Sequence, residues 1–249
     1  MSSTTVRQTK TVESKRTRGG RTAVRLAEDV APPAATKPSR TGSSANVRKP
    51  RRGEEVRERI LAAALECFGA FGFEGTSTRA IAERADVTHT LVLYHFQSKD
   101  QLWIATMEAA IGRYTNVVRA NLEGEGERSA KESLMVFIEQ FVRMSARTPE
   151  IHRILTTEGN QGTARLEWII ENLLRWHFTA IRDLIRRGQA EGSVREGDPA
   201  RLYYFIIGAG GTPFTLGTEY MAMTGRDVFS ETEILRNIAF IYEIVFTAR

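Results

Sequence analysis

Hydrophobic residues between Val56 and Phe71 recur at steps of three and four positions. This spacing puts them on one face of an amphipathic helix. They are Val56, Ile60, Leu61, Ala64, Leu65, Phe68 and Phe71. The pattern stops in the GAFGFEG segment at 69–75, whose glycines accept left-handed backbone angles. The spacing therefore predicts a helix that ends in this segment.

Two shorter helices are predicted next, each preceded by a residue that can cap it. Ser77 can cap the first, and Thr88 can cap the second, which extends to His95. A turn of about three residues separates them. Two short helices joined in this way are typical of a helix-turn-helix, whose second helix enters the major groove of DNA. We predict a DNA-binding domain at 53–101, with the motif at about 77–96.

The rest of the chain keeps helical spacing, with no alternating strand pattern and no internal repeat. This predicts an all-α fold: a three-helix DNA-binding domain followed by a helical domain at 102–249. Pro213 is expected to kink or interrupt one late helix. The later helices are predicted at 98–122, 127–146, 149–158, 163–190, from Pro199 onwards and at 230–247.

The last two long helices are apolar nearly all round, over 203–211 and 238–246. A second surface must therefore cover them. The glycine-rich run at 208–211 resembles a phosphate-binding loop, but no strand precedes it and no Lys-Ser or Lys-Thr pair follows. We expect close helix packing there instead.

Charge is unevenly distributed. Residues 1–52 contain 13 Lys and Arg against three acids, a net charge of +10, whereas residues 53–249 carry a net charge of −5. With few large apolar residues, the first 52 residues are expected to form a disordered basic extension. Arg48 to Arg52, including the candidate contacts Arg51 and Arg52, are placed to reach a minor groove. For residues 1–45, a solvated extension without consequence is an equal alternative.

The sequence contains little that would support an enzymatic function. No HExxH, CxxC or GxSxG motif is present, and the two histidines on the predicted recognition helix, His89 and His95, are spaced for different faces. We expect no catalytic residue, no metal site, no cofactor and no enzymatic activity. The single cysteine, Cys67, is expected to be buried in a reducing cytoplasm. The N-terminus lacks the apolar segment of a signal peptide, and no membrane span is expected.

The motif residues GF-x-x-T-S, IA, V-T and HF-x-SK-D-x-L make this segment similar to the DNA-binding domain of the TetR family of bacterial regulators. Three positions depart from the family pattern. Leu93 replaces a tyrosine, Thr90 replaces a glycine, and Ala80 replaces an acid, so that Ser77 caps its helix alone. Tyr94 is expected to take over the phosphate contact of the family tyrosine.

The resemblance implies a homodimer formed by the two C-terminal helices, with two recognition helices about 34 to 36 Å apart. It also implies a cytoplasmic, nucleoid-associated repressor that a small-molecule effector releases from its DNA operator. Base contacts are expected from His89, Thr90 and Leu91, with His95 either beside them or packed internally. Phosphate contacts are expected from Thr78, Arg79, Thr88, Tyr94 and Lys99.

An apolar or aromatic effector is predicted to bind among the middle helices, although ordinary core packing also explains aromatic residues at helical spacing. The candidates are Trp103, Met107, Phe137, Phe141, Met144, Trp168, Asn172, Trp176 and His177. The alternative function is a helix-turn-helix regulator without a small-molecule gate, which a protein partner controls or which acts as an architectural factor. A helical body without a cavity would favour that alternative.

Overall fold

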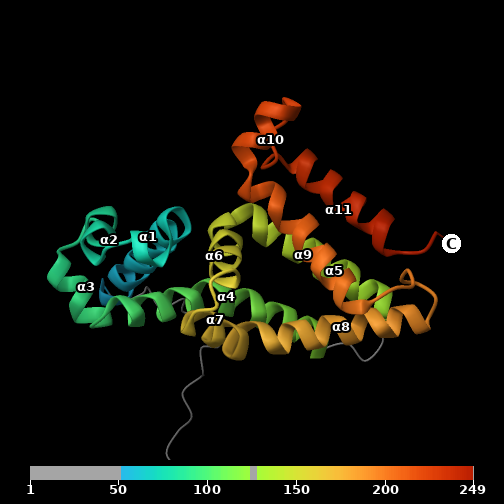
Figure 1. Cartoon of the computed structure of the whole chain (residues 1–249), viewed down its shortest axis with the longest axis horizontal. Helices are drawn as coiled ribbons and strands as arrows, with labels where there is room; N and C mark the ends of the chain where they lie inside the picture. The colour runs from blue at the N-terminus through green and yellow to red at the C-terminus, as the bar shows by residue number, and fades with distance from the viewer. Residues whose placement is uncertain (1–51, 124–127, 249) are drawn as a thin grey trace, which may run out of the picture. The chain divides into compact units, whose positions relative to one another are not determined.

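The computed structural model describes residues 52–123 and 128–248, and within these ranges the chain is built from helices (Figure 1). The first three are α1 (Arg52–Gly75), α2 (Thr78–Arg84) and α3 (His89–Phe96), and α4 (Lys99–Glu123) follows. The others are α5 (Ala130–Arg147), α6 (Pro149–Gly159), α7 (Ala164–Ile169), the π-helical turn η1 (Ile170–Leu174), α8 (Arg175–Ala190), α9 (Pro199–Thr215), α10 (Gly217–Thr224) and α11 (Glu231–Val245). The predicted all-α class is confirmed.

The predicted caps define the helix-turn-helix. Ser77 Oγ accepts a hydrogen bond from the amide of Ala80 at 3.1 Å, and Thr88 Oγ1 accepts one from the amide of Leu91 at 3.3 Å. Each bond satisfies an amide that lacks a partner within its helix. The turn between α2 and α3 contains Asp86 at a positive φ of 51°, which a short polar residue tolerates.

α1 is kinked near its end at Gly72, where φ is 68° and ψ is 178°. Such a conformation favours glycine, and it ends the regular helix inside the segment where the sequence predicts a stop. Thr76 stabilises the turn that follows. Its hydroxyl donates to the carbonyl oxygens of Gly72 at 2.7 Å and Cys67 at 3.0 Å. Cys67 itself is buried, as predicted.

Two late segments differ from the predicted helices. The single helix predicted at 163–190 is divided by η1, where the amide of Arg175 bonds to the carbonyl oxygen of Ile170, one residue farther than in an α-helix. α9 runs through Pro213 and ends at Thr215, so the interruption predicted at Pro213 comes two residues later. α10 was not among the predicted helices.

Buried side chains form two hydrophobic clusters. The first joins α1, α2, α3 and the first half of α4 to α6, α7 and η1, and the second joins α5, α8, α9 and α11 to the end of α4. The first cluster crosses the boundary predicted after residue 101, because Trp103 of α4 and Ile151 of α6 pack with Phe68 of α1. The division into two domains at that point stays a prediction. α4 contributes to both clusters and connects the recognition helix to the helical body (Figure 1).

The glycine-rich run in α9 permits close packing, as predicted. A methyl group added at Gly210 would lie 2.8 Å from Cδ1 of Phe141 in α5, and one at Gly211 would meet the ring of His152 in α6. These distances are shorter than van der Waals contact. Two glycines thus let α9 approach α5 and α6.

We predict that Gly210→Ala lowers the free energy of unfolding by about 1 to 3 kcal/mol, because the added methyl group overpacks the contact with Phe141. Gly112→Ala in α4 is the matched control. No heavy atom lies within 4 Å of a methyl group there, so this change should raise stability by up to about 1 kcal/mol through helix propensity. Urea denaturation of both variants measures the difference. Equal effects would contradict the packing argument.

No described helix is long and apolar enough to cross a membrane. Of the basic extension predicted at 1–52, residues 1–51 lie outside the described residues, and so does the candidate contact Arg51. The side chain of Arg52, the first residue of α1, is likewise not described.

Candidate DNA-binding interface and ligand cleft

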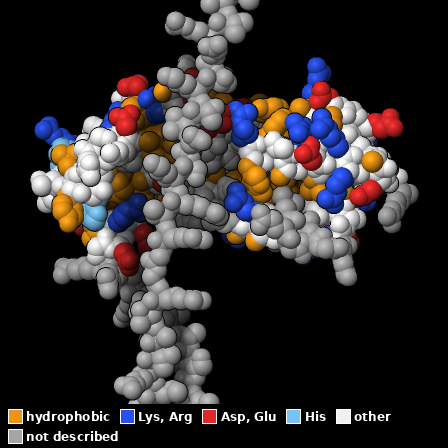
Figure 2. Space-filling view, turned by 90° about the horizontal axis from the view of Figure 1, so that it is seen from below, with side chains coloured by type: hydrophobic (Ala, Val, Ile, Leu, Met, Phe, Trp, Pro, Cys, Tyr) orange, Lys and Arg blue, Asp and Glu red, His pale blue; other side chains and the backbone are white. Residues whose placement is uncertain are grey.

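The recognition helix α3 has one buried and one exposed face. Val92 and Phe96 are buried in the first hydrophobic cluster. On the opposite side, Tyr94 is 79% exposed and Leu93 is 40% exposed, and Thr90 is also exposed. At the end of the molecule formed by α2 and α3, hydrophobic and histidine side chains reach the surface together (Figure 2). A helix that offers such residues to solvent is suited to contact base edges and phosphates.

The first turn of α3 is tied to the first turn of α2. His89 Nε2 and Thr78 Oγ1 are 2.9 Å apart, within hydrogen-bond distance. Both side chains are half-buried, so this bond fixes the angle between the two helices as well as the ring of His89. Of the other predicted contacts, Arg79 and Thr88 are exposed, and Leu91 is half-buried.

His95 and Lys99 lie at the end of α3 and the start of α4. The His95 ring is half-buried and makes edge contact with Tyr94, with ring centres 5.5 Å apart. The amine of Lys99 lies 4.2 Å from the centre of the Phe73 ring. A cation over an aromatic face is attracted by the ring, which holds the Lys99 side chain at the N-terminus of α4.

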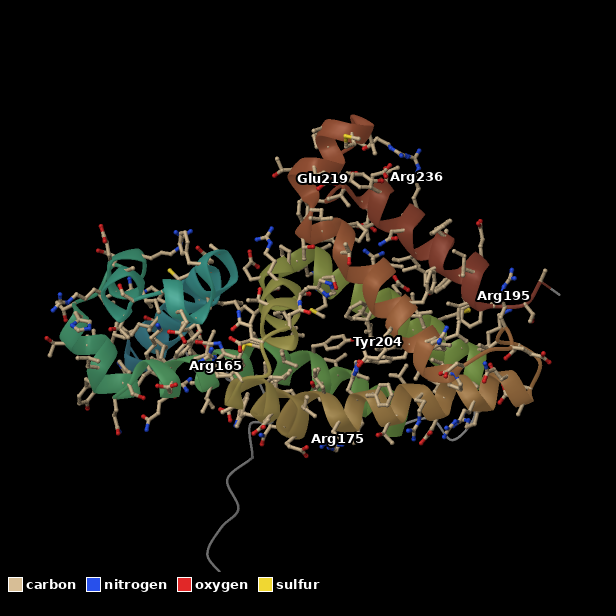
Figure 3. All side chains as sticks on the ribbon, in the orientation of Figure 1. Arg165, Arg175, Arg195, Tyr204, Glu219 and Arg236 are labelled. Carbon is tan, nitrogen blue, oxygen red and sulfur yellow. The ribbon has the colours of Figure 1, made fainter. Side chains whose placement is uncertain are left out.

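Phe73 also joins α1 to α7. The Arg165 guanidinium lies 3.9 Å from the centre of the Phe73 ring, and its Nε is 3.0 Å from the buried carboxylate of Glu158 (Figure 3). The same ring therefore contacts Lys99, next to the recognition helix, and Arg165, next to η1. This contact links the DNA-binding helices to the helices that pack behind them.

The face formed by α7 and α8 carries mixed charge. Arg side chains are interspersed there with Asp and Glu (Figure 2). Arg182 pairs with Asp183 at 3.0 Å, and Arg175 pairs with Glu171 on consecutive turns. Mutually neutralised charges offer little attraction to a phosphate backbone. The described surface best suited to DNA is therefore the exposed face of α3.

The nine predicted effector residues do not gather in one cavity. Trp103, Met107 and Trp168 belong to the first hydrophobic cluster, and the Trp103 and Trp168 rings meet edge to face at 5.9 Å. Asn172 is exposed and donates to the carbonyl oxygen of Trp168. The members that belong to the second cluster or pack against it are Phe137, Phe141, Met144, Trp176 and His177, of which Met144 touches both clusters. As effector contacts all nine stay predictions.

A cleft of about 1050 Å³ lies elsewhere, between α1, α4 and α5. Met144 is the only predicted effector residue that lines it. Two of the residues that line it, Tyr114 and Gln140, each contain a buried polar atom (Oη and Oε1) without a hydrogen-bond partner among the described residues. Buried polar atoms are nearly always paired, so these two indicate a site that a ligand or ordered water completes. Neither residue was predicted, because a polar residue on a helix gives no sign of burial until the helices around it are known.

His177 lies in an aromatic cluster beside this cleft. Its Nδ1 is 3.2 Å from the hydroxyl of Tyr203, and its Nε2 has no partner among the described residues. The ring also packs on Tyr114 and Phe137. Burial lowers the pKa of His177 from 6.5 to about 4, because a charged imidazolium would lose its hydration. The residue is therefore neutral in the folded chain at pH 7.

This burial predicts a pH-dependent stability. The unfolded chain takes up a proton on this histidine near pH 6.5, whereas the folded chain does so only near pH 4. Stability is therefore complete above about pH 6.5 and falls as the pH drops towards 4, by about 2 kcal/mol at pH 5. His177→Gln should flatten this slope in urea denaturation. Burial also lowers the pKa of His152, so some pH dependence of stability should remain in this variant. An unchanged slope in the variant would contradict the assignment.

Exposed apolar side chains gather on the C-terminal helices. Tyr204 of α9, labelled in Figure 3, is 67% exposed. Phe240 of α11 is 55% exposed. Seven of the eleven large hydrophobic side chains that the described residues expose lie between positions 204 and 240: Tyr204, Leu216, Met221, Met223, Phe229, Leu235 and Phe240. A concentration of exposed apolar side chains in one part of the chain is typical of a protein–protein interface.

Two protein-family models match this chain. One, described as "Bacterial regulatory proteins, tetR family", matches residues 60–106, which include α2 and α3. The other, described as "Tetracyclin repressor-like, C-terminal domain", matches residues 131–245. Both halves of the described chain therefore match the same family.

The chain is also similar to known transcriptional regulators and to a solved structure. The chain is 26% identical over 186 residues to the HTH-type transcriptional regulator RutR of Escherichia coli K12, covering 75% of this chain and 86% of RutR. It is 29% identical over 146 residues to the transcriptional repressor NicS of Pseudomonas putida, covering 57% and 68% of the two chains. The hemolysin II regulator HlyIIR shares the fold, with a TM-score of 0.57 and 22% identity over 76% of this chain and 97% of its own.

These relatives are transcriptional regulators, a class without enzymatic activity. The motif residues, the helix-turn-helix geometry and the two family models lead to the same assignment. The chain belongs to the TetR family of helix-turn-helix transcriptional regulators.

Proposed function

We propose that the chain is a homodimeric repressor that binds an operator through α3 and leaves it when a small molecule binds to the helical body. The observation that carries this proposal is the course of α4. It begins at Lys99 beside the recognition helix, and its middle residues line the cleft of about 1050 Å³. A ligand in that cleft touches α1 and α4 together, so its binding alters the position of α3.

Sequence-specific contacts are assigned to the exposed face of α3. Thr90 and Leu93 face bases, and Tyr94 donates its hydroxyl to a phosphate. Lys99 and Arg79 hold further phosphates and position the helix. His89 has a double role, because its bond to Thr78 supports the turn while its ring edge remains available to a base.

Dimerisation is assigned to α9 and α11. Their exposed apolar side chains, with Tyr204 and Phe240 among them, need a covering surface, and a second copy supplies the same surface by two-fold symmetry. Two copies then place two recognition helices one turn of DNA apart. The cleft with its unpaired polar atoms favours a ligand-gated regulator over the ungated alternative.

Two variants test the roles of the contacts on DNA selected from a random pool. Lys99→Ala should weaken binding severalfold on every sequence and reduce the salt slope by about one, because it removes a phosphate contact. His89→Ala should change the preferred bases. Arg186→Ala on the exposed surface of α8 is the control and should leave binding unchanged. Unaltered affinity and preference in both test variants would refute the docking.

A further inference from the structure

One aromatic ring contacts two cations where the DNA-binding helices meet the helical body. Phe73 follows the kink in α1, and its side chain is half-buried. The amine of Lys99 lies 4.2 Å from the centre of this ring, and the guanidinium of Arg165, which is labelled in Figure 3, lies 3.9 Å from it. Both distances are short enough for a cation–π interaction. The ring therefore connects the start of α4 with the start of α7.

Arg165 is held in place by residues of the helical body. Its Nε lies 3.0 Å from the carboxylate of Glu158, which is buried in α6 and also accepts a hydrogen bond from the hydroxyl of Thr163 at 2.7 Å. A buried carboxylate that loses its cation is costly, so this pair fixes the guanidinium. Glu74 lies 3.6 Å from the same guanidinium. The two carboxylates offset the charge of Arg165, which reduces its repulsion of Lys99.

No carboxylate of the described ranges pairs with Lys99, whose side chain is half-buried. Its charge is therefore available to a DNA phosphate. A flexible lysine loses rotamer freedom when a phosphate fixes it, whereas a lysine already held over a ring has less freedom to lose. The contact with Phe73 thus prepares Lys99 for a phosphate, and loss of this contact should weaken DNA binding.

α7 makes a second contact with the same group of aromatic rings. Trp168 meets Trp103 of α4 edge to face at 5.9 Å, and Trp103 meets Phe73 edge to face at 6.5 Å. Arg165 and Trp168 are three positions apart, which places them on the same side of their helix. A displacement of α7 would therefore reach Phe73 both through Arg165 and through Trp103.

From these contacts we infer that Arg165 is a positioning residue for DNA binding. Through the Phe73 ring it holds the amine of Lys99 where a phosphate binds, so the position of α7 in the helical body affects the affinity for DNA. The inference rests on the proposed function, because it requires that Lys99 contacts a phosphate. It adds a second connection between the helical body and the recognition helix, since none of these three residues lines the cleft between α1, α4 and α5.

The test measures, by fluorescence anisotropy, the affinity of full-length variants for a DNA duplex that the wild-type chain selects from a random pool. Arg165→Gln and Phe73→Leu should each weaken binding about two- to fivefold, the range expected for one cation–π contact. Neither should weaken it more than Lys99→Ala, because both act only through Lys99. Each should also lower the salt slope, since the phosphate contact is less often made. Phe73→Leu leaves the pair of Arg165 and Glu158 intact.

Two further variants separate this role from a loss of folding. Arg165→Gln leaves Glu158 buried without its cation, whereas Glu158→Gln combined with Arg165→Gln replaces both charges by amides that can bond to each other. This double variant should unfold at a temperature closer to wild type and still bind DNA more weakly. Arg182→Gln on α8 is the matched control and should leave DNA affinity unchanged. Arg182 also pairs with a carboxylate, that of Asp183 at 3.0 Å, and lies 5.6 Å from the centre of the Phe178 ring.

The decisive measurement repeats the comparison in the Lys99→Ala background. A positioning residue has nothing left to position there, so Arg165→Gln and Phe73→Leu should cause no further loss of affinity. A merely structural role would weaken binding by the same factor in both backgrounds. Equal factors, or full affinity in Arg165→Gln and in the double variant, would overturn the inference while the proposed function stands. A wild-type chain that selects no DNA would refute the proposed function and the inference with it.

Discussion

Phe240→Asp is expected to convert the dimer to a monomer and to weaken operator binding by more than about a hundredfold. Phe240 is 55% exposed on α11, within the apolar surface that we assign to the second copy. An aspartate there buries a charge without a partner if the dimer forms. A monomer also loses the gain in affinity that comes from binding two half-sites at once.

Sedimentation velocity measures the oligomeric state, and anisotropy with operator DNA measures affinity. The control is Thr179→Asp, an acidic substitution at an exposed position of α8, which should remain dimeric. Circular dichroism checks that both variants stay helical. A Phe240→Asp protein that stays dimeric with full affinity would remove α11 from the interface.

Tyr94→Ala should also have a large effect and weaken operator binding by about ten- to a hundredfold. The side chain is 79% exposed on α3, so the unfolding temperature should not change. A hydrogen bond to a charged phosphate is stronger than one between neutral groups, which is the physical reason for the large loss.

Tyr94→Phe separates the hydroxyl from the ring. If the hydroxyl donates to a phosphate, the phenylalanine variant should bind nearly as weakly as the alanine variant on every operator sequence. Wild-type affinity in Tyr94→Phe would show that the ring, and not the hydroxyl, makes the contact.

The helix-turn-helix could be predicted from the sequence because its determinants are local. Ser77 and Thr88 cap helices within three residues of themselves, and Gly72 takes a backbone conformation that few other residues accept. Apolar spacing likewise reveals helices such as α5, where one face is buried. These signals need no knowledge of distant neighbours.

The cleft between α1, α4 and α5 could not be predicted, because it depends on how α1 packs against two helices that follow later in the chain. Tyr114 and Gln140 are ordinary polar positions until α4 and α5 bury them without partners. Of the aromatic residues predicted to bind an effector, Phe137 is 2% exposed and packs in the second hydrophobic cluster, and its role as an effector contact stays a prediction. η1 was not predicted, because a π-helical turn hardly changes the spacing of the apolar residues around it.

Mapping the binding sites of the chain across its own genome tests whether α3 reads DNA. We expect a shared inverted repeat whose half-sites are centred about 10 base pairs (one helical turn) apart, or a multiple of that distance. In the same measurement, Tyr94→Ala should lose occupancy at these sites. Enrichment without a shared motif, or the same sites at full occupancy in Tyr94→Ala, would contradict DNA reading by α3.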